Sequence, residues 1–237
     1  MRKRWLPWVL AAPITLVVIV PVAVWTYLNV VRDDAPDRLT LDAGAGEGTA
    51  TTAAGATPAT AAPGAPLDGV WKVGAGSTAG YRVKEILFGQ DATAVGRTDD
   101  VTGQIEVAGT TVTSASFTVD MTTVASDESR RDNQFRGRIM DVARFPTSTF
   151  VLTAPVSVGA LPGEGEQVTV EATGDLTLRG TTRRVTVDLG AQRSGGGIRV
   201  AGSIPVVFGE WGIPNPSFGP AEVGDRGELE FLLVLTR

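Results

Sequence analysis

The sequence contains neither cysteine nor histidine among its 237 residues. Without cysteine there are no disulfides and no thiol nucleophile, and without both residues the usual zinc ligands are missing. The absence of histidine also removes the commonest general base of enzymes. We therefore expect no catalytic centre, no metal site and no cofactor.

Positive charge is also scarce: 21 lysines and arginines stand against 26 aspartates and glutamates, which gives a formal net charge of −5. Nucleic acids are bound by concentrated basic surfaces, so we expect no nucleic-acid partner. Domains typically contain about 100–200 residues, and part of this chain has a composition unlike that of a globular protein. The length therefore allows about one folded domain.

A long uncharged stretch lies near the N-terminus, from Trp5 to Val31. About 20 apolar residues are enough to cross a bilayer, and the basic residues at positions 2–4 predict a cytoplasmic N-terminus with the rest of the chain outside. The alternative is a cleaved signal peptide, whose apolar stretch is usually about 7–15 residues long. Because the run ends in aromatic residues at Trp25 and Tyr27, an interfacial anchor fits it better. We interpret residues 1–31 as a basic tip and transmembrane helix of a single-pass cell-membrane protein.

Residues 32–66 are rich in alanine, threonine, glycine and proline, and contain no aromatic residue and no periodic apolar pattern. Such a segment cannot bury enough surface to order itself. A flexible chain of this length has a typical end-to-end distance of about 30–35 Å. We predict a disordered linker that keeps the following domain near the membrane.

From residue 67 to the C-terminus, short segments rich in valine, threonine, isoleucine and phenylalanine alternate with clusters of glycine, proline and aspartate, which is typical of strands. Several alternate apolar and polar residues with period two, so each has one apolar face. The predicted strands are Gly69 to Val73, Gly80 to Lys84, Val101 to Val107, Thr111 to Met121, Thr147 to Val158, Val168 to Leu178, Arg183 to Ala191, Gly197 to Val207 and Gly227 to Leu235. About eight strands joined by short turns favour a mainly β domain at residues 67–237, closed as a barrel or packed as a sandwich.

One segment, Ser126 to Met140, is too polar for a strand and is interpreted as a short helix. Its acidic residues, Asp127, Glu128 and Asp132, could in principle serve a hydrolase as paired carboxylates. Acids early and arginines late also stabilise a surface helix, and we favour this structural interpretation. Its four arginines, at positions 130, 131, 136 and 138, could contact lipid headgroups or simply form a solvated face.

The surplus of apolar inward positions is the clearest functional signal. An eight-stranded barrel either fills its interior with side chains or holds one small ligand. The sequence leaves both possibilities open.

The order of several short motifs resembles that of a known family. These motifs are Phe117 to Met121, the pair Arg131 and Asp132, Phe135, Phe145 to Phe150, Gly174 to Arg183, and Phe208 to Ile213. In this order the chain, from Leu67 to Arg237, resembles the YceI-like, polyisoprenoid-binding domain family. The apolar N-terminal run is similar to that of its membrane-anchored actinobacterial type.

The resemblance implies an eight-stranded antiparallel, lipocalin-like barrel with one short helix, here preceded by a single transmembrane helix. It also implies a tunnel that binds an isoprenoid lipid, such as a quinone or a polyprenyl lipid, for storage or transfer. Side chains alternate between the two faces of each strand, and this alternation together with the resemblance predicts which residues line the tunnel: Phe117, Val119, Phe150, Leu152, Val170, Leu176 and Val187. The alternative function is a ligand-free structural or protein-interaction module, whose protein partner the sequence does not name.

Overall fold

The computed structural model of the protein describes residues 35–42 and 66–237. Within these two ranges no helix is long and apolar enough to cross a membrane. The predicted membrane helix, residues 5–31, and most of the predicted linker lie outside the described residues.

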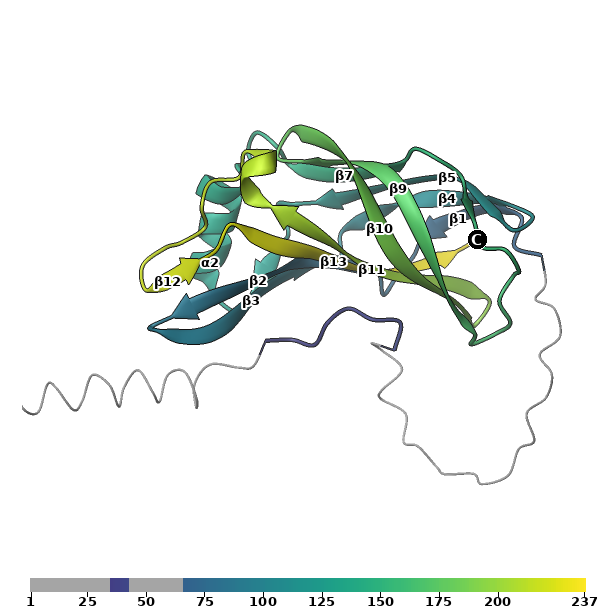
Figure 1. Cartoon of the computed structure of the whole chain (residues 1–237), viewed down its shortest axis with the longest axis horizontal. Coiled ribbons are helices and arrows are strands. Elements are labelled where there is room, and N and C mark those ends of the chain that lie inside the picture. Colours follow the sequence, from purple (N-terminus) through teal and green to yellow (C-terminus); the bar gives the residue numbers. More distant parts are fainter. Residues whose placement is uncertain (1–34, 43–65) are drawn as a thin grey trace, which may run out of the picture. The chain divides into compact units, whose positions relative to one another are not determined.

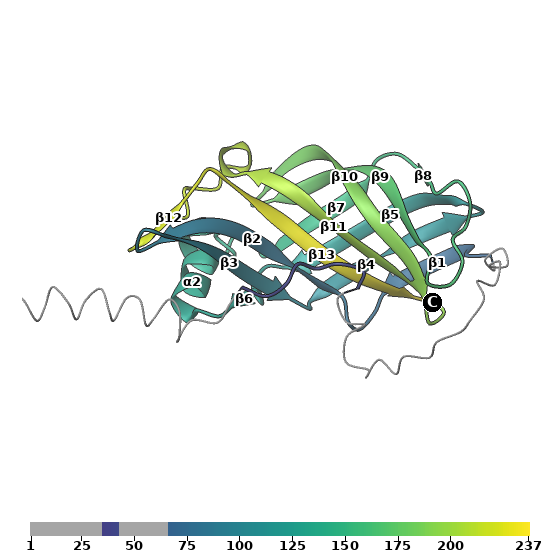
Figure 2. The same cartoon turned by 60° about the horizontal axis from the view of Figure 1, so that its bottom comes forward.

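Eight antiparallel strands form a closed barrel, in which each strand pairs with the next in the order β1, β4, β5, β7, β9, β10, β11 and β13. The ring closes where β13 pairs with β1, with Lys72 opposite Thr236. Figures 1 and 2 show the strands winding obliquely around a common interior. The predicted barrel with one short helix is thus confirmed.

The strands of the ring have the following bounds: β1 Gly69–Val73, β4 Val101–Ala108, β5 Thr111–Asp120, β7 Thr147–Leu152, β9 Gln167–Leu178, β10 Thr181–Ser194, β11 Gly197–Val207 and β13 Arg226–Thr236. The remaining strands are β2 Thr78–Leu87, β3 Gln90–Thr98, β6 Ala125–Ser126, β8 Val156–Ser157 and β12 Ala221–Val223.

Strands β1 and β2 follow each other along the same edge of β13. Ser77 stabilises the bend between them, because its buried hydroxyl donates to the carbonyl of Gly74 and accepts the backbone N–H of Val234 in β13. Beyond the bend, β2 pairs with β3, and β3 pairs with the short β6. The β2–β3 hairpin therefore extends from the ring toward the end of the barrel that carries α2 and β12 (Figure 1).

Tight turns set the register of the longest strands. Arg179 and Gly180 both have positive φ, of 50° and 74°, in the two-residue turn from β9 to β10. This backbone twist matches that of the flanking strands. Gly180 also has a steric requirement, since a Cβ there would lie 2.3 Å from the ring of Phe145. Gly195 and Gly196, with φ of 59° and 80°, form the turn between β10 and β11.

The predicted helix is present but shorter and divided. It begins at α2 (Ser129–Gln134), with Glu128 as its N-cap, and continues as one turn of π-helix, η2 (Phe135–Ile139). Phe135 and Met140 are buried, and Ile139 packs against the same cluster. A second short helix, the 3-10 turn η3 (Phe208–Trp211), follows β11.

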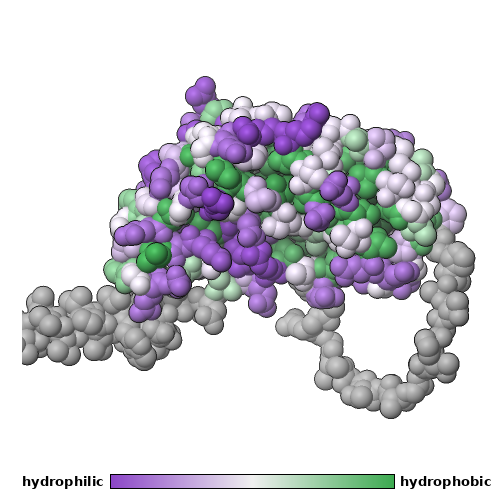
Figure 3. All heavy atoms as spheres, in the orientation of Figure 1, coloured by the Kyte–Doolittle hydropathy of each residue, from purple (hydrophilic) through white to green (hydrophobic). Residues whose placement is uncertain are grey.

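Two hydrophobic clusters occupy the barrel. One lies between β1, β4 and the C-terminal half of β13, and includes Trp71, Ile105 and Leu235. The other extends from the middle of β9 and β10 to the helices. On the outside, strongly hydrophilic side chains gather toward the α2 end of the face seen in Figure 3, while the strands at its centre carry hydrophobic and weakly polar ones.

Candidate functional site

All seven side chains predicted to line a tunnel belong to the hydrophobic clusters of the barrel. The register brings several of them together: Phe117 lies opposite Phe150, and Phe150 lies opposite Leu176. Leu176 and Val187 are buried, with 3% and 4% exposure. The other five, Phe117, Val119, Phe150, Leu152 and Val170, are only partly buried.

Partial exposure is shared by interior positions that sequence reasoning did not select for the site. Leu189 lies opposite Val170, and the same row continues through Gly202 to Phe231 on β13. Leu229 lies two residues before Phe231 on that strand. The group of partly buried interior side chains absent from the predicted lining is Tyr81, Val83, Val185, Leu189, Leu229 and Phe231. The alternation of apolar and polar residues along their strands is the sequence signal that could have identified them as interior positions. In a filled core such residues are usually almost completely buried, whereas here each of them keeps part of its surface accessible.

Aromatic rings lie over glycines of neighbouring strands. A Cβ added to Gly174 would lie 2.2 Å from Cζ of Phe150, and one at Gly103 would lie 2.8 Å from Cδ1 of Phe117. Tyr81 covers Gly96 and Phe231 covers Gly202 in the same way, with closest approaches of 2.4 and 2.8 Å. Each ring therefore occupies the space that a side chain on the neighbouring strand would need.

The two ends of the interior differ. Near β1 the barrel is densely packed, with Trp71 3%, Leu233 4% and Leu235 0% exposed. At the other end Phe135 stacks on Tyr81 of β2, with ring centroids 5.1 Å apart. Trp211 of η3 is buried with the helix residues, and its indole N–H has no hydrogen-bond acceptor within the described part of the chain. The interior thus offers apolar walls and one buried donor without a partner.

The adjacent Arg131 and Asp132 attach the helix to the barrel. Arg131 forms an ion pair with Glu85 of β2 at 3.4 Å and another with Asp127. Asp132 accepts the backbone N–H of Ser126 at 2.9 Å and its hydroxyl at 2.7 Å. These contacts connect β2, β6 and α2, so the pair positions the helix.

The acidic cluster, Asp127, Glu128 and Asp132, is engaged in the same local structure, because Glu128 accepts the N–H of Arg130 as the helix cap. This supports the structural interpretation of the cluster over the catalytic one. Burial raises the pKa of the nearby Tyr81 hydroxyl, with Arg131 opposing the shift. Among the described residues, no group of three or more acidic side chains could hold a metal ion.

The other helix arginines also make contacts within the domain. Arg138 donates to the carbonyl oxygens of Asn215, Pro216 and Ser217. Arg136 donates to the carbonyl of Val124, and the guanidinium of Arg130 lies 5.5 Å from the ring centroid of Phe218. The arginines that could contact lipid headgroups therefore bind neighbouring loops of the same domain instead.

Comparison with known proteins identifies one family model, described as the YceI-like domain, which matches residues 71–235. A polyisoprenoid binding domain from Saccharophagus degradans, implicated in plant cell wall breakdown, is similar in structure, with a TM-score of 0.56 and 16% sequence identity over 70% of this chain and 97% of that one. Burkholderia cenocepacia BcnA gives a TM-score of 0.55 and 20% identity over 68% of this chain and 98% of its own. No curated protein sequence matches the chain.

Proposed function

Because the chain belongs to the YceI-like domain family, we propose that its barrel binds an apolar lipid, of the isoprenoid class, between the helix-closed end and the packed end of the interior. The observation that carries this proposal is the partial exposure of interior side chains such as Val170, Leu189 and Phe231. An isoprenoid has a long apolar chain and few polar groups, which suits walls of valine, leucine and phenylalanine. Quinones and polyprenyl lipids both have this form.

The wall geometry supports an occupant along the axis of the barrel. Phe117, Phe150 and Phe231 each lie over a glycine of a neighbouring strand. A large ring that occupies the place of a missing wall side chain takes less room from the centre of the interior. The seven predicted lining residues are retained in this proposal, and Leu189, Leu229 and Phe231 are added to them.

We further propose that the barrel is tethered to the outer face of the cytoplasmic membrane and stores or passes on its lipid there. The support is the uncharged run from Trp5 to Val31 with basic residues before it. On the same ground we assign the chain to the membrane-anchored type of the family found in actinobacteria. No catalytic role is proposed, because the acidic residues of α2 are engaged in helix capping and ion pairs.

Mass spectrometry of an organic extract tests the lipid proposal. The full-length protein, purified in a detergent that carries no isoprenoid, should release an isoprenoid lipid in a fixed ratio to protein. The alternative function, a structural or protein-interaction module, predicts a folded barrel whose extract contains only the bulk lipids of the membrane.

A further inference from the structure

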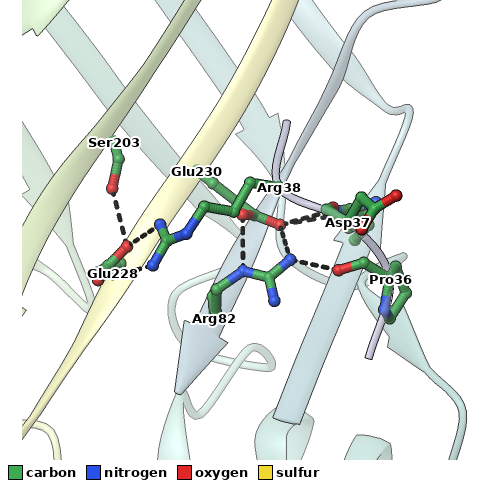
Figure 4. A network of polar contacts seen from close by, with 8 residues as sticks. Pro36, Asp37, Arg38, Arg82, Ser203, Glu228 and Glu230 are labelled. Atoms are coloured by element: carbon green, nitrogen blue, oxygen red, sulfur yellow. Dashed lines mark hydrogen bonds and ion pairs between the residues drawn. The ribbon is translucent and has the colours of Figure 1, made fainter. Parts of the chain in front are cut away.

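A short stretch of the predicted linker lies on the outer wall of the barrel. Arg82 of β2 donates to the carbonyl oxygen of Pro36 at 2.5 Å, and Arg97 of β3 donates to that of Asp37. Arg38 forms an ion pair with Glu228 of β13 at 2.5 Å. Figure 4 shows the segment crossing these strands, with Arg38 directed toward Glu228. We call Pro36–Asp42 the docked segment.

A buried carboxylate lies beneath the docked segment. Glu230 is 2% exposed, although alternation along β13 places it on the outer face. Arg82 binds it through Nε at 3.0 Å and Arg97 through Nη2 at 2.7 Å. Burial of a charge is costly unless it is paired, and here both arginines also reach the backbone of the docked segment. The segment thus completes and covers an ion network that would otherwise face solvent.

Leucine side chains add an apolar contact. Leu41 is 4% exposed and packs on Ala201 of β11 and Leu232 of β13, both outward-facing and buried. A Cβ at Gly190 of β10 would lie 3.2 Å from Cδ1 of Leu41, so the glycine leaves room for it. Leu39 packs against the same residues. The docked segment therefore has both a polar and an apolar anchor.

The docked segment begins only a few residues after the uncharged run that we interpret as a membrane anchor. Only four residues, Arg32 to Ala35, separate the uncharged run from Pro36. Four extended residues span at most about 14 Å, whereas the whole linker has a typical reach of about 30–35 Å. We propose that the outer wall of β13, β2, β3 and β11 is a docking site for the chain's own juxtamembrane segment. Docking would replace a long tether by a short one; this consequence rests on the proposed membrane anchor.

Cysteine labelling tests the docking in the intact chain, since the protein has no cysteine of its own. Ala201→Cys, beneath Leu41, should react with a maleimide at least about tenfold more slowly than Val151→Cys on the exposed outer face of β7. Adding Leu41→Asp should abolish this protection. Thr40→Asp is the matched control, because Thr40 is exposed and the added charge is the same. Equal labelling of Ala201→Cys and Val151→Cys in the otherwise unaltered chain would overturn the docking.

Charge exchange tests the ion pair independently. Arg38→Glu and Glu228→Arg should each increase labelling of Ala201→Cys, because each places like charges together. Their combination should restore protection. Double-variant labelling as fast as that of the single variants would refute the assigned contact. None of these measurements depends on lipid, so failure of the lipid proposal leaves their outcome unchanged.

Proteolysis on membranes tests the short tether. A cleavage site for a sequence-specific protease placed within residues 43–65 allows the chain to be cut there while the docked segment stays on the anchor side. We expect the cut barrel to remain with the membrane, and Leu41→Asp to release it. Release of the cut barrel that carries Leu41 would contradict the short tether, and recovery of the uncut protein in the soluble fraction would instead contradict the anchor itself.

Discussion

The ring of Phe150 occupies the space that a side chain at Gly174 would need, since a Cβ there would lie 2.2 Å from Cζ of the ring. Gly174 belongs to β9 and Phe150 to its neighbour β7. The glycine thus permits a bulky residue at the wall, and it couples the backbone of one strand to the shape of the barrel interior.

We expect Gly174→Ala to move the Phe150 ring away from the wall. Extra atoms in a packed site commonly cost about 1–3 kcal/mol, so the free energy of unfolding should fall by that amount. Lipid recovery should fall too, because the displaced ring enters the interior. Gly224→Ala is the control: a Cβ there meets nothing within 4 Å, and the change should stay within about 0.5 kcal/mol. Equal stability of the two variants in urea titrations would contradict the wall contact.

The docked segment should weaken in acid. Hydrogen bonding from Arg38 lowers the pKa of Glu228, against the opposing effect of burial, and Ser203 and Arg82 lower it further. A carboxylate with a depressed pKa stabilises the folded state above its ordinary pKa of about 4.3, and this contribution is lost as the pH falls through the folded value.

Urea titrations of the unaltered protein and Glu228→Gln should therefore differ in unfolding free energy at pH 6 and converge as the pH falls below about 4. A difference that stays constant down to pH 3 would show that the ionised Glu228 does not stabilise the docked segment.

Asp132 should matter for folding and not for chemistry. Asp132→Ala removes the acceptor for the N–H and hydroxyl of the partly buried Ser126. A fully buried donor left unsatisfied typically costs about 1–3 kcal/mol, so the loss here should lie at the lower end of that range. A lower melting temperature is the expected result. The isoprenoid bound by the two proteins should be chemically the same in mass spectra. A modified isoprenoid made by the unaltered protein, and not by a folded Asp132→Asn variant, would establish catalysis.

The proposed topology predicts the outcome of proteolysis on intact cells. After removal of the wall, protease added outside should digest the barrel and leave an N-terminal tag protected, because the basic residues at positions 2–4 predict a cytoplasmic N-terminus. A barrel that becomes digestible only after the membrane is permeabilised would contradict the topology.

Period-two patterns predicted the ring strands, because each of them buries one face. The predicted strand Thr147 to Val158 is wrong in its length, since the structure divides it into β7 and β8. β3 was missed for a physical reason: its inward residues, among them Ala94 and Gly96, are small, and Gly96 lies under the ring of Tyr81. A strand whose inward side chains are small shows no alternation of large apolar and polar residues, so its sequence does not indicate a strand.

The sequence carried a weak signal for the docked segment as well. Leu39 and Leu41 alternate with polar residues, but they stand in a stretch dominated by alanine, threonine and glycine. Their partners, Ala201 and Leu232, are more than 150 positions away, so only the folded barrel brings the contact together. The aromatic and glycine pairs of the interior likewise depend on register between strands, which local pattern does not supply.

The most direct test of lipid binding is the amount of isoprenoid per folded barrel in paired variants of neighbouring residues. Leu152→Asp and Val170→Asp place a carboxylate on the inner face, whereas Val151→Asp and Thr169→Asp place the same group on the exposed outer face. An apolar chain cannot solvate a carboxylate, so the inner variants should lose most of their lipid and the outer variants should keep it.

The folding of these variants distinguishes a lipid-binding interior from a packed one. Leu235→Asp is the reference for a packed core: Leu235 is 0% exposed, so this variant should unfold. Mass spectrometry of extracts from Leu152→Asp and Val170→Asp, both shown to be folded by circular dichroism, then decides. Folded inner variants depleted of lipid are the predicted result; folded inner variants with the lipid content of Val151→Asp, or unfolding of both like Leu235→Asp, would contradict a lipid-binding interior.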